Sequence, residues 1–287
     1  MADDGVPMLD EGLFGPRTVT WQLHGDPTMW IAGICSLFLQ ALHPRAVAAV
    51  VQNSRFQQDP IGRLRRTSDF VGVATYGTTD KAAAAAERVR HVHRVLSATD
   101  PRTGERIRLD DPDLLLWVHC AEVATFAEVV RRAGFPITDA QHDRYLDEQR
   151  RSAELVGLDP QQVPGSRAEM DAYSRRVRPE LARTAESEVV FRFLHHPLRS
   201  RRWRPLNAGY LPIGRLAYSL LPAWAHDLHG RKALPSAVTT SGARAFRAAG
   251  KAVPDRLRYR FPSGHVLRAV ERMGEGAFPS TRALAEL

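Results

Sequence analysis

The sequence predicts an all-α protein with a single large helical domain. Apolar residues recur at helical spacing through most of the 287 residues, and no series of segments alternates with the period of two typical of strands. Strand-like pieces are short, such as residues 105–109. The length allows a sizeable buried core. We therefore expect one all-α domain over residues 29–287, preceded by an N-terminal arm over residues 1–28.

Helix signals divide the first half of the chain. Pro44 follows an apolar segment and can only end that helix or open the next one. Asp80 is a suitable N-cap, and Gly134 is a suitable stop after a long apolar segment. The helices expected in this half cover residues 29–43, 45–53, 80–96 and 113–133.

The second half continues the helical pattern. Gly157 ends an amphipathic segment, and residues 166–169 have the form of a capping box that opens another helix. The helices expected here cover residues 139–156, 179–195, 212–225, 236–251 and 264–273, with one more that begins at 166. The intervening stretches 160–165 and 196–207 are too short to establish a domain boundary.

Positive charge is concentrated in the last third of the chain. The formal net charge is +8, and residues 199–287 carry 16 Lys and Arg against 5 Asp and Glu, whereas the preceding residues carry 24 against 27. The run 199–204 leads this surplus and suggests a mobile basic loop. Such a region either contacts nucleic acid, an anionic lipid surface or an acidic partner, or is simply a solvated arginine-rich face. Because no helix-turn-helix is recognisable, we expect no specific nucleic acid partner.

Targeting and redox signals point to the cytoplasm. The start of the chain is acidic and lacks the basic and apolar regions of a signal peptide. The longest apolar run, residues 29–42, is too short to span a bilayer. The two cysteines, Cys35 and Cys120, lie in apolar runs and are expected to be buried reduced thiols.

Three histidines are candidates for chemistry. His91 and His93 are two residues apart on one predicted helix, about 200° around its axis, so at most one of them faces inward. His119 lies within an apolar run, where Glu122 three residues on could hydrogen-bond it. Each histidine is either a core residue with a structural partner or part of a site. His43 is expected to finish the helix that precedes Pro44.

Arg63 and Arg66 share a face if residues 62–76 are helical, with Thr67 on the adjacent side. Two guanidiniums so close repel each other unless an anion lies between them, so this pair is either an anion site or a solvated basic turn. Motifs for a di-iron bundle, a zinc protease, a nucleophile elbow and a phosphate-binding loop are all missing from the sequence. A haem site needs only one imidazole, an apolar cavity and cations for two propionates.

These residues carry a resemblance to a known family. The stretches 42–44, 54–56 and 59–67, with residues 88–93 and 117–119, resemble in order and approximate spacing the catalytic domain shared by bacterial rubber oxygenases (latex-clearing proteins) and fungal MpaB oxygenases. The resemblance implies a cytoplasmic haem b oxygenase with a haem pocket between helices. It also implies O₂ and a small apolar, isoprenoid or lipid-like substrate as partners.

The resemblance assigns roles to individual residues. His93 matches the proximal iron ligand, Arg63 and Thr67 match the arginine and threonine of the Arg-x-x-Lys-Thr motif, and His119 matches a further histidine near the haem. Arg66 replaces the motif lysine, and a guanidinium has no lone pair to give to iron. Gln52 is the nearest counterpart of the catalytic glutamate, and an amide cannot take up a proton as a carboxylate does.

Three functions follow from these expectations. The first is an oxygenase with His93 as iron ligand, Arg63 and Arg66 at the propionates or the distal side, and Thr67 and His119 as hydrogen-bonding residues. The second is a non-catalytic haem sensor or carrier on the same fold, which Gln52 and Arg66 favour. The third is a basic helical nucleic-acid-binding protein. The sequence leaves the oligomeric state open.

Overall fold

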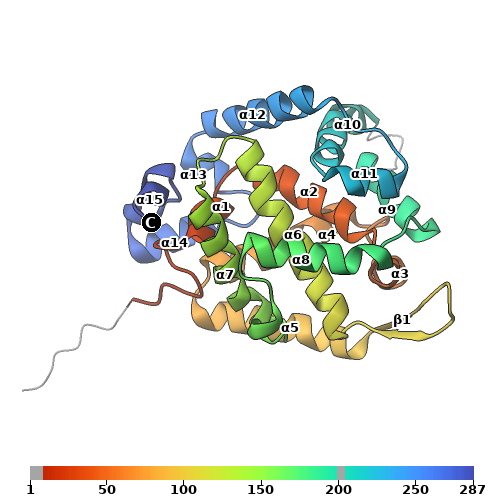
Figure 1. Ribbon diagram of the computed structural model, residues 1–287. Helices are drawn as coiled ribbons and strands as arrows, with labels where there is room; N and C mark the ends of the chain where they lie inside the picture. The colour runs from red at the N-terminus through yellow and green to blue at the C-terminus, as the bar shows by residue number, and fades with distance from the viewer. Residues whose placement is uncertain (1–8, 199–203) are drawn as a thin grey trace, which may run out of the picture.

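The computed structural model describes residues 9–198 and 204–287, and the protein is almost entirely helical (Figure 1). Within these ranges the α-helices are α1 (Val19–His24), α2 (Met29–Gln40), α3 (Pro44–Asn53), α4 (Pro60–Tyr76), α5 (Thr79–Val95), α6 (Pro112–Arg132), α7 (Asp139–Leu155), α8 (Arg167–Val177), α9 (Ala185–His195), α10 (Arg204–Ser219), α11 (Ala223–His229), α12 (Ser236–Ala252), α13 (Asp255–Arg258), α14 (His265–Met273) and α15 (Thr281–Ala285). The 3-10 turns are η1 (Pro160–Gln162), η2 (Arg178–Glu180) and η4 (Glu275–Ala277). The predicted all-α class is confirmed.

The strands form one short hairpin between α5 and α6. Strand β1 (Ser97–Thr99) pairs antiparallel with β2 (Arg106–Arg108), and Ala98 lies opposite Ile107. Both of these side chains are buried, whereas the flanking residues of β2 are exposed. The hairpin projects from the edge of the molecule in Figure 1, and its apolar pair anchors it to the core.

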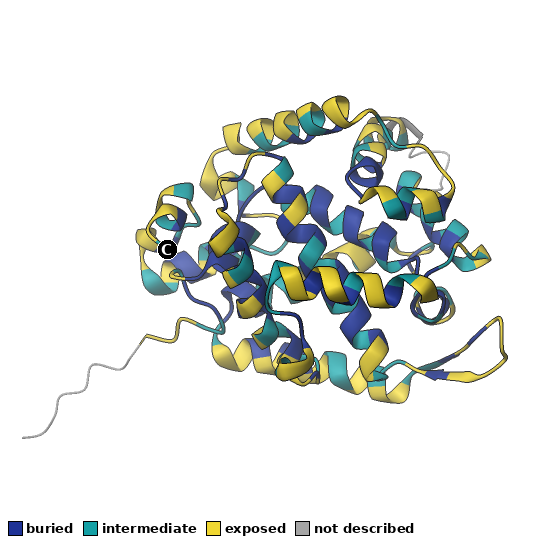
Figure 2. Cartoon of the chain, viewed as in Figure 1, coloured by how far each residue is buried: buried dark blue, intermediate teal, exposed yellow. Residues whose placement is uncertain are grey.

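The core lies between α2 and α6, which run side by side through the centre of the molecule (Figure 1). Cys35 and Phe38 of α2 and Cys120 and Ala127 of α6 are buried in a single cluster. Both cysteines are free, as the sequence predicts. Figure 2 shows buried residues along these two helices, whereas α12 covers one side of the molecule with an exposed outer face. The central helices are thus positioned by burial of apolar surface from both sides.

The chain bends sharply between α2 and α3. Helix α2 ends at Gln40, and His43 lies outside it as the N-cap of α3, where its Nδ1 accepts from the Ala46 N–H at 3.4 Å. The prediction that His43 finishes the first helix is therefore wrong, because its side chain satisfies a free N–H of the next helix instead. Across the described residues no single helix is long and apolar enough to cross a membrane; only α2 and α3 together, 110° apart, pass that test.

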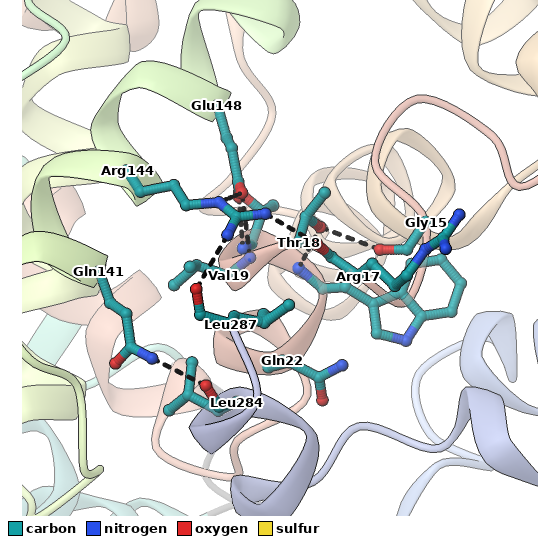
Figure 3. A network of polar contacts seen from close by, with 12 residues as sticks. Gly15, Arg17, Thr18, Val19, Gln22, Gln141, Arg144, Glu148, Leu284 and Leu287 are labelled. Carbon is teal, nitrogen blue, oxygen red and sulfur yellow. Dashed lines mark hydrogen bonds and ion pairs between the residues drawn. The ribbon is translucent and has the colours of Figure 1, made fainter.

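The residues predicted as an N-terminal arm include a buried helix. Glu148 of α7 accepts from the Val19 N–H at 3.1 Å and the Thr20 N–H at 2.8 Å, and Arg144 holds the same carboxylate at 3.0 Å (Figure 3). The carboxylate thereby satisfies free N–H groups at the positive end of α1. Gln141 and Arg144 also donate to the carbonyls of Leu284 and Leu287, which ties the end of the chain to the same place. Residues 19–28 therefore belong to the folded body rather than to an arm.

Two predicted helices have different limits in the structure. The segment 179–195 begins with the turn η2, and α9 starts only after Thr184, which caps it by accepting from the Ser187 N–H. The segment 212–225 is divided between α10 and α11, and Pro212 lies inside α10 rather than at its start. The basic run 199–204 lies outside the described residues except for the backbone of Arg204, so the predicted basic loop has no structural account here.

Candidate functional site

Helix α4 carries the three motif residues, and only one of the two motif arginines has an acidic partner. Asp59 caps α4 by accepting from the Gly62 N–H at 2.9 Å, and the same carboxylate group pairs with Arg66 at 3.2 Å. Thr67 donates to the carbonyl of Arg63 at 3.1 Å, within its own helix. Arg63, Arg66 and Thr67 are all exposed. The charge of Arg66 is therefore compensated by Asp59, whereas Arg63 has no carboxylate partner among the described residues.

His93 lies near Arg63 at the end of α5. Its side chain is partly buried, and its Nδ1 has no hydrogen-bond partner within the described part of the chain, whereas His91 is exposed, as the two-residue spacing predicts. Burial lowers the pKa of His93; the Asp110 carboxylate opposes this shift, and the Arg63 charge adds to it. The imidazole is thus neutral at physiological pH and keeps a lone pair.

Although the Arg63 side chain is exposed at the surface, the surrounding protein partly desolvates its guanidinium, and this desolvation and the neighbouring Arg66 charge lower its pKa. The guanidinium still carries its full charge at neutral pH. A neutral imidazole and an unpaired guanidinium therefore stand close together where α4 begins and α5 ends. This is the donor set that haem requires, since one nitrogen binds the iron and a cation balances a propionate.

His119 belongs to a second group, on α6. Burial lowers its pKa to about 4, and its Nε2 has no hydrogen-bond partner among the described residues. The predicted bond to Glu122 is not formed, and no hydrogen bond joins His119 to His93 or Arg63. Glu122 itself makes no ion pair in the described structure, and burial raises its pKa to about 7. Glu122 is partly buried, and a carboxyl with a raised pKa and no ion-pair partner is a recognised mark of a functional site.

A hydrogen-bonded chain lies beside Glu122. His24 of α1 contacts Thr75 of α4 through Nδ1 at 2.8 Å and Tyr145 of α7 through Nε2 at 3.2 Å. Thr75 donates its own hydrogen to the Val71 carbonyl at 2.8 Å, so its oxygen accepts from His24 Nδ1–H. His24 Nε2 then accepts from the Tyr145 hydroxyl. Burial lowers the pKa of His24 to about 3, which keeps the ring neutral in this role.

Tyr145 connects this chain to Glu122. Burial and then the negative charge of Glu122 raise the pKa of Tyr145. Because the Tyr145 hydrogen is committed to His24, its oxygen lone pairs remain available to a protonated Glu122 carboxyl or to a bridging water. His24 also packs edge-on against Phe126, one turn after Glu122, with 5.7 Å between ring centroids. Sequence reasoning missed His24, Thr75 and Tyr145 and treated Glu122 only as a partner for His119.

Gln52 has a structural role. Its amide donates to the Thr99 carbonyl and accepts from the Thr99 N–H, both at 2.8 Å. The neighbouring Asn53 donates to the Ser97 carbonyl at 3.1 Å. These two amides attach the β-hairpin to the end of α3. Gln52 is therefore committed to backbone groups, and its identity carries no information about a catalytic base.

No group of three or more His, Cys, Asp or Glu side chains that could hold a metal ion occurs in the described ranges. Apolar side chains on inner helices are, however, only partly covered. They are Ile34 and Leu37 of α2, Val71 of α4, and Leu115 and Val118 of α6. These residues pack against the core and keep part of their apolar surface uncovered.

Residues 21–254 match the family model described as the catalytic domain of the ER-bound oxygenase mpaB/B′ and rubber oxygenase. The chain belongs to this family. The match starts within α1, which agrees with the packing of this helix into the body, and ends just after α12. The family supports an oxygenase-like function. No curated protein matches the chain, and no solved structure does.

Proposed function

We propose that the protein is a b-type haem-dependent oxygenase that oxidises a small apolar substrate, isoprenoid or lipid-like, with O₂. One observation carries the proposal beyond the family: the neutral His93, with an unpartnered ring nitrogen, lies near the unpaired Arg63 cation. When bound, haem would supply the activation of O₂ that no amino-acid side chain provides. His93 would hold the iron, and Arg63 would balance a propionate.

Arg66 and Thr67 have supporting roles in this proposal. The Arg66 charge is paired with Asp59, and a guanidinium has no lone pair for iron, so Arg66 would not serve as an iron ligand. Thr67 would exchange its bond to the Arg63 carbonyl for one to the bound group. His119, neutral and with a buried Nε2 that has no partner in the described structure, would offer a hydrogen bond to the bound group or substrate without adding a charge.

In this proposal, Glu122 is the residue that accepts and donates protons. Its pKa of about 7 lets the carboxyl hold or release a proton near neutral pH, which an amide at Gln52 does not do. The chain Tyr145, His24 and Thr75 fixes the direction of the Tyr145 hydroxyl beside it. A protonated Glu122 can then donate toward the Tyr145 oxygen, and an ionised Glu122 can accept from a substrate or a water.

The role of Arg63 is tested by haemin titration of the apoprotein. Removing the cation in Arg63→Gln should weaken haemin binding by about tenfold, since a charge-assisted hydrogen bond is worth roughly 1.5–3 kcal/mol. Arg65→Gln is the matched control, because Arg65 is exposed on the same helix and makes no ion pair in the described structure. Equal haemin affinities of the two variants would show that Arg63 does not take part in haem binding.

The pKa of Glu122 is tested by the pH dependence of stability. Its folded-state pKa of about 7 lies above the ordinary 4.5, so the folded protein binds more protons between these values, and Glu122 stabilises less as the pH rises. The free energy of unfolding of the wild type minus that of Glu122→Gln should fall by up to about 3 kcal/mol between pH 5 and pH 8. The buried histidines have the opposite dependence, but they are common to both proteins. If the difference in the free energy of unfolding does not change with pH, the pKa of Glu122 is not raised in the folded protein.

The proposal also covers the cellular location of the protein and its binding of nucleic acid. We propose a cytoplasmic location and no specific nucleic acid partner. In support, several arginines of the basic last third are already paired with carboxylates, at 2.7 Å for Arg247 with Asp26 and 2.7 Å for Arg256 with Glu275. Peripheral contact with anionic surfaces through the rest of this third stays part of the proposal. The haem sensor is the second candidate, and turnover of a substrate with O₂ would exclude it.

A further inference from the structure

A cavity lies far along the chain from the His93 group. It is formed by α9, α10 and the connection between α11 and α12, and its volume is about 640 Å³. This size is typical of small-molecule sites. None of the residues that line it belongs to α4, α5 or α6. A function for this cavity is therefore independent of the proposed haem site.

The lining of this cavity is strongly cationic. Arg192, Arg215, Arg231 and Lys232 line it, and no Asp or Glu does so among the described residues. The nearby Glu188 pairs with Arg231 at 2.6 Å and also with Arg183 outside the cavity at 2.7 Å. One carboxylate is thus shared by two arginines.

Three of the lining cations stay uncompensated. Arg192 donates only to the backbone carbonyl of Glu188, at 3.3 Å, and Arg215 and Lys232 make no ion pair in the described structure. Like charges gathered around one cavity repel each other, and a bound polyanion relieves that repulsion.

The rest of the lining is apolar and aromatic. Phe191, Leu211, Tyr218 and Leu234 supply it, and Arg231 lies over the Phe191 ring at 4.3 Å from its centroid. The Tyr218 hydroxyl donates to the Arg231 carbonyl at 3.0 Å, which fixes the connection that carries Arg231 and Lys232. The cavity therefore offers cationic and apolar side chains together.

His195 of α9 also lines the cavity. Its Nδ1 contacts the Phe191 carbonyl at 3.0 Å, so this nitrogen carries the hydrogen and Nε2 keeps its lone pair. Burial lowers the pKa of His195, and the ring is neutral at physiological pH. It can accept from a hydroxyl of a ligand that reaches into the cavity.

We propose that this cavity binds a small organic phosphate. The phosphoryl group would lie among Arg192, Arg215 and Lys232, and the apolar part of the ligand would lie against Leu211, Tyr218 and Leu234. A phosphate monoester carries about two negative charges at neutral pH and three acceptor oxygens, which suits three unpaired cations better than a single carboxylate does. The apolar side chains of the lining favour this ligand over free inorganic phosphate.

The test uses the full chain and the fluorescent probe 1-naphthyl phosphate. We expect saturable binding of this probe. 1-Naphthol, which lacks the phosphoryl group, and inorganic phosphate, which lacks the apolar ring, should each bind more weakly by at least about tenfold. The double variant Arg215→Gln/Lys232→Gln should weaken probe binding by about tenfold or more. Both side chains are exposed, so the variant should unfold at the wild-type temperature.

Two controls separate this site from its alternatives. Arg282→Gln removes a cation whose side chain is 92% exposed on α15, and it should bind the probe as the wild type does. Arg63→Gln should also leave probe binding unchanged. The proposal would be overturned by unchanged affinity in the double variant, by equal affinity for 1-naphthol, or by equal affinity for inorganic phosphate.

Discussion

His93→Ala is expected to abolish most of the Soret absorbance of the purified protein. The imidazole of His93 is neutral because burial lowers its pKa, and its Nδ1 has no partner in the described structure, so a ring nitrogen is available to iron. Alanine removes that ligand without introducing bulk. His91→Ala is the matched control, because its side chain is exposed on the other side of α5 and should not affect the spectrum.

The measurement is the ratio of Soret to protein absorbance, with circular dichroism to show that both variants keep their helices. Loss of the band in His91→Ala alone would mean that the wrong member of the pair was assigned. Loss in neither variant would shift the assignment to another imidazole, of which His119 has a buried unpartnered nitrogen.

Trp21→Ala is expected to lower the free energy of unfolding by about 3–5 kcal/mol, the range for truncating a large buried aromatic side chain. Trp21 is fully buried, its indole nitrogen donates to the Ala277 carbonyl at 2.8 Å, and it packs edge-on against Tyr76 at 4.7 Å between ring centroids. Truncation would leave a cavity and an unsatisfied carbonyl between the first helix and the end of the chain.

Urea unfolding with an unchanged slope would measure this loss. Trp30→Ala is the matched control, since Trp30 is only partly buried and stacks on the exposed Phe261, so its loss should cost much less. Equal costs for the two tryptophans would show that α1 does not support the body, and that an arm describes residues 1–28 better.

The helices of the core could be predicted because their signals are local. Pro44, Thr138 and Ser166 stand at the starts of α3, α7 and α8, and the apolar spacing of α6 marks its buried side. The prediction that His91 and His93 point to opposite sides of their helix followed from helical geometry alone. These features need no knowledge of the rest of the molecule.

Helix α1 could not be predicted, because six residues are too few to form a helix by propensity. Thr20 and Gln22 look like surface residues in the sequence, but each is buried and bonded to a distant segment. Thr20 accepts from Gln149 at 3.0 Å, and Gln22 accepts from the Ser280 N–H at 2.7 Å. The helix exists because these tertiary contacts satisfy its polar groups.

The sites were only partly predictable for the same reason. Glu122 lies in an apolar stretch of α6, and this could have identified it, but its lack of an ion-pair partner depends on how the other helices pack. The cationic cavity brings Arg192 of α9 and Arg215 of α10 together with Lys232 of the connection between α11 and α12, and no spacing in the sequence indicates that they meet. Pro212 suggested a helix start, and the structure places it inside α10.

The visible absorption spectrum of the freshly purified wild-type protein tests the central claim most directly. We expect a Soret band, with a ferric form that binds cyanide or imidazole readily, because Arg66 is paired with Asp59 and cannot give a lone pair to iron. A protein that shows no Soret band, and gains none when haemin is added in stoichiometric amount, would contradict the account.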